Sequence, residues 1–207
     1  MKNLRSLCLP SLGVLRLIPL LFVCSLAQAT VIQFQASLSG PAEVPVNASP
    51  GIGWANVWFD DVAQTLSVNV TFSGLLGLTT ASHIHAPTAV PNTGTGGVAT
   101  EVPFFDSFPI GVTSGSYTHL FDLTAASSFN PAFVTSNGGT LASASAALEN
   151  AMLGEKAYLN IHTDKFRGGE IRGFLSRVPD TGATALLLTL ALGALAGFAR
   201  VRKLRIC

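Results

Sequence analysis

The central part of this 207-residue sequence lacks cysteine. The three cysteines, Cys8, Cys24 and Cys207, all lie near the two ends of the chain. A disulfide within residues 30–177 is therefore excluded, although an exported compartment would permit one. The fold of this stretch must depend on its own hydrophobic core.

Residues 30–177 also have few basic side chains. They hold five lysines and arginines against ten aspartates and glutamates, so their net charge is −5 although that of the whole chain is +1. Proteins that bind DNA or RNA need a basic face to neutralise the phosphates. This composition excludes nucleic acid as a partner.

Motifs of the common catalytic sites are missing as well. No serine lies in a Gly-x-Ser-x-Gly turn. The glycine-rich residues 94–97 lack the lysine and the strand context of a phosphate-binding loop. These absences favour a protein that is not an enzyme.

The first 29 residues have the order of a secretory signal peptide. Basic side chains precede an apolar run at residues 17–26, and the small residues Ala27 and Ala29 mark a cleavage site. An uncleaved membrane anchor is the alternative, but the run is shorter than the ~20 residues that a spanning helix needs. We expect export by the Sec translocation machinery and cleavage after Ala29.

A second apolar segment lies near the C-terminus. Residues 183–199 carry no charge, and as a helix they would reach about 25 Å, enough to span a thin bilayer. The basic tail 200–207 follows at once. Because lysine and arginine beside a spanning helix stay in the cytoplasm, the rest of the protein is expected outside. A buried soluble helix is the alternative, which the basic tail disfavours.

Between these ends, apolar and polar side chains alternate, as in strands with one buried face. In residues 65–72 every second side chain is apolar. Similar strands are predicted at 31–38, 53–59, 116–123, 157–162 and 170–175, with Gly, Pro, Asn and Asp between them. The pattern predicts an all-β domain over residues 30–177, an antiparallel sandwich or barrel of Greek-key type.

Two segments depart from this pattern. Residues 143–153 are rich in alanine and predict a short helix on one side of the sandwich, with Ala144, Leu148 and Met152 on one face. Residues 87–115 are rich in Pro, Gly and Thr and are interpreted mostly as a long surface loop.

Three histidines form a candidate metal site. His83 and His85 would project from one face of a strand, and His162 would lie on the outer face of the strand at 157–162. If these strands are neighbours, the three imidazoles converge, and neutral imidazole is a common ligand of zinc and copper. The alternative is a structural role, in which each ring binds a backbone carbonyl or Asp164.

The segment after His162 predicts a β-hairpin. Gly168 and Gly169 would form the turn. Glu170 and Arg172 would then lie on one face of the second strand, where a cross-strand ion pair is expected rather than a catalytic acid.

Three segments together resemble the CHRD domain, a module named after chordin that recurs in bacterial exported proteins. They are FQASLSGPAEVPVNASPGIGWANVWFD, ASHIHAP and AYLNIHTDKFRGGEIRGFL, in the order that the family has them. Arg167 stands where the family often has proline. The resemblance implies an extracellular β-module without established catalysis, and it supplies no ligand.

The C-terminal residues 178–207 are similar to PEP-CTERM sorting signals, closest to the VPDSG variant. The motif here is Val178, Pro179, Asp180, Thr181 and Gly182, with threonine in place of serine. This resemblance implies an exosortase, a membrane protease similar to a transpeptidase, as a processing partner. We expect a membrane-anchored precursor, and then a module displayed at the cell envelope or in the extracellular matrix, where polysaccharide or protein would be its partner.

Overall fold

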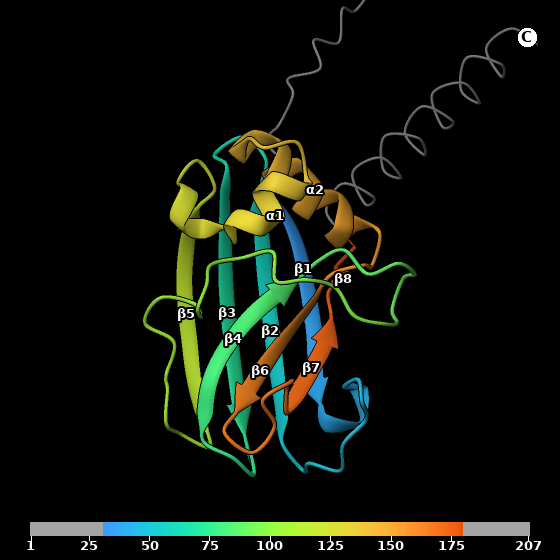
Figure 1. Cartoon of the computed structure of the whole chain (residues 1–207), viewed down its shortest axis with the longest axis vertical. Helices are drawn as coiled ribbons and strands as arrows, with labels where there is room; N and C mark the ends of the chain where they lie inside the picture. Colours follow the sequence, from blue (N-terminus) through green and yellow to red (C-terminus); the bar gives the residue numbers. More distant parts are fainter. Residues whose placement is uncertain (1–30, 180–207) are drawn as a thin grey trace, which may run out of the picture.

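Residues 31–179, the part of the chain that the computed structural model describes, form a curled antiparallel sheet with two helices at one end (Figure 1). The expected signal peptide and the apolar segment 183–199 lie outside these residues. No helix within residues 31–179 has the length and apolar character needed to cross a membrane. The strands are β1 (Val31–Ser39), β2 (Ile52–Asp60), β3 (Thr65–Ser73), β4 (Thr79–His85), β5 (Gly115–Asp122), β6 (Tyr158–Thr163), β7 (Ile171–Phe174) and β8 (Ser176–Arg177).

The strand order is β4-β6-β7-β1-β2-β3-β5, and β8 pairs with β1 beyond the end of β7. β1, β2 and β3 follow one another as a meander. The chain then crosses to form β4 at one edge of the sheet, and it returns to form β5 at the other edge, beside β3. All pairings between these strands are antiparallel. The predicted mainly β, antiparallel architecture is confirmed, in the form of a half-barrel.

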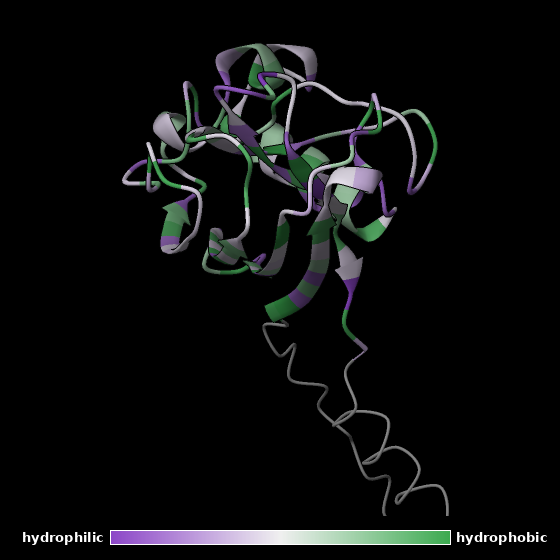
Figure 2. Ribbon diagram, turned by 90° about the horizontal axis from the view of Figure 1, so that it is seen from below, coloured by the Kyte–Doolittle hydropathy of each residue, from purple (hydrophilic) through white to green (hydrophobic). Residues whose placement is uncertain are grey.

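The core lies inside the curl, where side chains from both halves of the sheet meet. Phe34, Val57 and Val68 from one half are fully buried with Ile84 and Ile161 from the other, all in one cluster. Figure 2 shows the alternation of apolar and polar residues along the strands that produces this inward apolar face.

The turn between β2 and β3 shows how local chemistry fixes this register. The Asp60 carboxylate accepts hydrogen bonds from the backbone N–H groups of Val62 and Ala63, and Gln64 adopts a positive φ of 53°. An aspartate that binds the backbone two or three residues later closes a tight turn. As a result Asp60 pairs with Thr65.

Helix α2 (Leu141–Leu153) covers the predicted helical segment and begins two residues earlier. Thr140 caps it through a reciprocal pair of hydrogen bonds with Ser143. The residues predicted to share one face, Ala144, Leu148 and Met152, are all buried. The helix caps one end of the curled sheet, not a side (Figure 1). The sequence analysis missed α1 (Pro131–Ser136), which Asn130 caps.

The segment between β4 and β5 is more than a surface loop. Its backbone runs along the free edge of β4, where Ala99 N–H donates to Ile84 O and Phe105 N–H donates to Ser82 O. The Phe105 ring is fully buried and stacks on Tyr117 of β5, with ring centroids 5.6 Å apart. This segment thus closes the gap between the two edge strands.

We predict that Phe105→Ala destabilises the domain by roughly 3–5 kcal/mol, the usual cost of removing a buried phenylalanine. Stability is lost because removal of the Phe105 ring leaves a cavity between β4 and β5. Urea unfolding followed by circular dichroism measures it. Phe104→Ala is the matched control, since Phe104 is only partly buried and should cost clearly less. Equal losses in the two variants would contradict a plugging role for Phe105.

Candidate functional site

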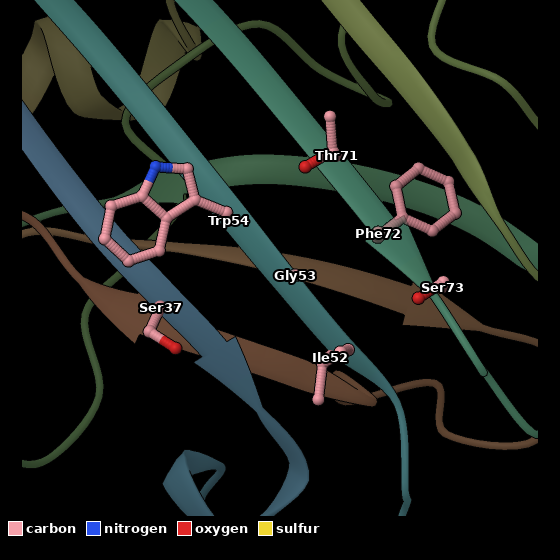
Figure 3. Close-up of a pocket in the computed structure, with 7 residues that line it drawn as sticks. All are labelled: Ser37, Ile52, Gly53, Trp54, Thr71, Phe72 and Ser73. Atoms are coloured by element: carbon pink, nitrogen blue, oxygen red, sulfur yellow. The ribbon is translucent and has the colours of Figure 1, made fainter.

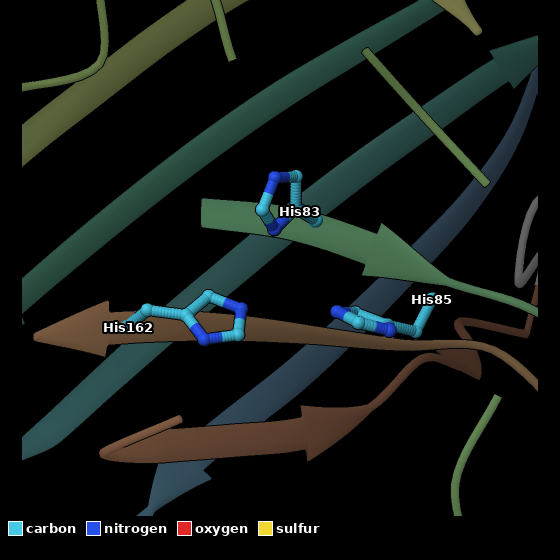
Figure 4. A group of neighbouring side chains, drawn as sticks. All are labelled: His83, His85 and His162. Atoms are coloured by element: carbon cyan, nitrogen blue, oxygen red, sulfur yellow. The ribbon is translucent and has the colours of Figure 1, made fainter. Parts of the chain in front are cut away.

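The three predicted histidines lie together on the outer face of β4 and β6 (Figure 4). Antiparallel pairing sets Ala81 opposite His162 and His83 opposite Asn160, so these side chains share a face. The ring centroid of His83 lies 5.3 Å from that of His162 and 5.8 Å from that of His85. The alternate residues on these strands, such as Ile84 and Ile161, enter the core.

A backbone carbonyl holds each imidazole through one ring nitrogen. His83 Nε2 lies 2.8 Å from Pro103 O, and His85 Nδ1 lies 2.9 Å from Gly96 O. His162 Nδ1 lies 2.8 Å from the oxygen of Arg167. The carbonyls of Gly96 and Pro103 belong to the segment between β4 and β5, and that of Arg167 belongs to the loop between β6 and β7. The two loops therefore orient the rings.

Within the described residues 31–179, the second nitrogen of each ring has no hydrogen-bond partner. These atoms, His83 Nδ1, His85 Nε2 and His162 Nε2, are all buried. One ring nitrogen of each histidine lies within 4.8 Å of one in each of the other two. Such an arrangement can bind one metal ion.

Burial keeps the three rings neutral. His83 is 6% exposed and His85 is 9% exposed. Desolvation by burial lowers the pKa of His83 to about 4. It also lowers the pKa values of His85 and His162, against the raising effect of their carbonyl partners. Neutral imidazole is the form that binds metals.

Aromatic and cationic groups surround the cluster. The Tyr158 ring stacks on His85 at 4.8 Å between centroids, and the guanidinium of Arg172 lies 4.7 Å from the centre of the Tyr158 ring. Arg172 donates to Ala42 O and Gly94 O. This layer fixes His85 from the side that faces β7.

Arg172 also lies beside a buried acid, Glu43. The Nε atom of Arg172 is 3.8 Å from Glu43 Oε2. Burial raises the pKa of Glu43 to about 7, although Arg172 acts to lower it. Gly169, with φ of 130°, leaves room for this carboxylate, since a Cβ there would overlap with it. The sequence analysis did not single out Glu43.

The structure differs from the expected ion pair between Glu170 and Arg172. β6 and β7 are antiparallel neighbours as the predicted hairpin requires, and Gly169 rather than Gly168 takes the positive φ. Glu170 accepts hydrogen bonds from Ser49 Oγ and Thr163 Oγ1 and from two backbone N–H groups. Burial acts to raise its pKa, but these hydrogen bonds lower it overall.

A second candidate surface is the outer face of β1, β2 and β3. Trp54 is 43% exposed there, and Figure 3 shows it on β2 between Ser37 of β1 and Thr71 of β3. These residues line a hollow of about 500 Å³. The predicted strands have one buried face, which leaves these residues on the other, but the hollow carries no local sequence signal.

We predict that Glu43→Gln changes how stability depends on pH. Folded Glu43 keeps its proton up to about pH 7, whereas a free glutamate loses it near 4.5. Unfolding therefore releases a proton in this window, and the free energy of unfolding falls through it as pH rises. The variant should lack this fall in urea titrations between pH 5 and 7.5. Glu155→Gln, at an exposed position, is the control; if Glu43→Gln also left the curve unchanged, the prediction would be wrong.

Comparison with known proteins supports one assignment. No curated protein and no solved structure matches the chain. The family model for the CHRD domain matches residues 34–175, which contain the histidine cluster, Glu43 and all strands but the two-residue β8 and the start of β1. Since this match covers more than half of the sequence, the chain belongs to the CHRD domain family.

Proposed function

We propose that the chain is an exported CHRD module that acts at the cell envelope or in the extracellular matrix by binding rather than by catalysis. The observation that carries this proposal is the CHRD match over residues 34–175, because CHRD domains are typically extracellular. The apolar segments at both ends of the sequence support export.

The position of the sorting motif agrees with processing by an exosortase. Val178 N–H donates to Gln33 O at 2.8 Å, so the motif 178–182 starts where the chain leaves β8. Pro179 is exposed, and a proline keeps the residue before it extended. The part of the motif that the structure describes thus ends at an exposed residue, which supports access by a protease without unfolding of the domain.

For the binding role we propose the outer face of β1, β2, β3 and β5. Away from Asp60 and Asp122 at one end, its side chains are mainly uncharged amides, hydroxyls and two tryptophans, and the exposed apolar side chains Val31, Ile52 and Leu120 lie among them. Across the paired strands the polar and aromatic ones include Gln33, Gln35, Ser37, Trp54, Asn56, Trp58, Ser67, Asn69, Thr71, Ser116 and Thr118.

This surface suits a neutral polysaccharide. Amides and hydroxyls both donate and accept hydrogen bonds, as sugar hydroxyls require. The exposed indole ring of Trp54 and the partly exposed ring of Trp58 offer flat apolar area against the C–H faces of a sugar. Trp54 and Trp58 lie four residues apart on β2, about 13 Å at the rise of a strand. The absence of charge from the middle of the face disfavours an acidic polymer.

The anchoring part of the proposal predicts that a chain without residues 180–207 moves from the envelope to the medium, because the apolar segment and its basic tail are gone. Cell fractionation with intact-mass analysis measures this. The shortened chain keeps the hydrogen bond of Val178, so the domain should stay folded.

A double variant, Pro179→Ala with Asp180→Ala, separates anchoring from processing. It keeps the apolar segment and should remain in the membrane fraction at the mass of the uncleaved C-terminus. Release of this variant, or retention of the shortened chain in the membrane fraction, would refute the sorting proposal.

The binding part predicts that Trp54→Ala weakens retention on the producing cells' own neutral polysaccharide by at least about tenfold. One buried aromatic contact is commonly worth that much, ~1.4 kcal/mol or more. Affinity electrophoresis in polysaccharide gels measures the shift. Val62→Ala is the control, since Val62 is 70% exposed but lies in the turn between β2 and β3. Equal mobility of wild type and Trp54→Ala would exclude this face.

A further inference from the structure

We propose that His83, His85 and His162 form a mononuclear site that binds one copper or zinc ion, with copper the more tightly held. This site lies on β4 and β6, apart from the outer face of β1, β2, β3 and β5, and it adds an activity that the proposed function does not contain. Four properties of the cluster carry the inference.

The first property is the tautomer of each ring. A carbonyl oxygen only accepts hydrogen bonds, so the nitrogens that face Pro103 O, Gly96 O and Arg167 O must carry the hydrogen. A neutral imidazole has one N–H and one lone pair. The lone pairs therefore lie on His83 Nδ1, His85 Nε2 and His162 Nε2, the atoms that lack a partner.

The second property is the electrostatic cost of this arrangement. Three buried lone pairs gather in one place without accepting a hydrogen bond, and each unsatisfied buried acceptor costs about 1–3 kcal/mol. Buried polar groups in proteins are almost always paired. A cation bound by all three nitrogens would remove this cost in a single step.

The third property is the distance between the ligand atoms. Zinc–nitrogen bonds of ~2.0–2.1 Å in a tetrahedral site set the nitrogens about 3.3 Å apart. One ring nitrogen of each histidine lies within 4.8 Å of one in each of the other two. Drawing three atoms from at most this separation to a metal requires an inward shift of about 0.8 Å or less for each, which small ring rotations supply.

The fourth property is the support outside the ligands. In metal sites the second nitrogen of a ligating histidine usually donates to a carbonyl or carboxylate, which fixes the ring and its tautomer. All three histidines have such a partner here, at 2.8–2.9 Å. A purely structural histidine needs one such bond, but it does not need its free nitrogen aimed at two others.

The choice of metal follows from the ligands. Within residues 31–179 the cluster contains only imidazole nitrogens, without thiolate or carboxylate. Imidazole suits copper and zinc, whereas carboxylates suit magnesium and calcium. With the same ligands, copper(II) binds more tightly than zinc(II). Three protein ligands also leave a coordination position open.

The test uses the full chain, purified in detergent, stripped with EDTA and treated with iodoacetamide to block Cys8, Cys24 and Cys207. Copper(II) and zinc(II) are titrated separately against a chromophoric chelator. We expect one ion per chain, tighter binding of copper and a rise in melting temperature, since only the folded form holds the three nitrogens together. The copper spectrum in electron paramagnetic resonance should show coupling to imidazole nitrogen.

The key variant is His162→Ala, because His162 is the least buried of the three. It should bind either metal at least about 100-fold more weakly, beyond the range seen when only a supporting partner is removed. His119→Ala is the matched control, since His119 is the fourth histidine of the chain and lies on β5. It should bind as the wild type does. Circular dichroism without metal verifies that each variant is folded.

Three results would overturn the proposal: no binding of copper or zinc by the folded wild type, equal weakening by His162→Ala and His119→Ala, or full metal affinity in folded His162→Ala. None of them bears on export or on the polysaccharide surface. A failure of the metal site and a failure of the proposed function are thus distinguishable.

Discussion

The structure depends on the burial of β4, β6 and β7 on both faces. One face of these strands lines the core, through Ile84, Leu159 and Ile161, and the other lies beneath loops. Polar side chains on the second face therefore lose contact with water and need partners within the protein. The carbonyls of the covering loops provide them, at Gly96, Pro103 and Arg167 for the histidines and at Ala42 and Gly94 for Arg172.

The same constraint orders the loops. The segment between β4 and β5 would be costly to fix by its own contacts, since each ordered residue loses about 1–2 kcal/mol of backbone entropy. It is held by two kinds of contact at once, the burial of Phe105 in the core and the hydrogen bonds from His83 and His85 on the outer face. The histidines are thus structural partners of the loops through one nitrogen, which leaves the other nitrogen available for a ligand.

The sequence predicted the strands better than it predicted their surroundings. Alternation identified β1, β2, β3, β5, β6 and β7, because one face of each is mainly apolar. α1 has only six residues, too few for a periodic signal. The ion pair of Glu170 with Arg172 was expected from a spacing of two on an extended strand, but β7 begins at Ile171, so Glu170 lies in the preceding loop. The buried Glu43 carries no local signal, since its burial comes from residues more than 100 positions away.

The convergence of the histidines was predictable only in part. Alternation showed that His83 and His85 share a face and that His162 lies opposite the core on its own strand. Whether the rings meet depends on the pairing of β4 with β6, strands 70 or more residues apart, which no local pattern sets. Because Ala81 rather than His83 pairs with His162, His162 lies diagonally from His83, and the three ring centroids are 5.3–6.0 Å apart. A shift of this register by one residue would turn His162 into the core. The two faces of the pair β4 and β6 therefore fix each other: the apolar residues that seal the core also determine where the three nitrogens point.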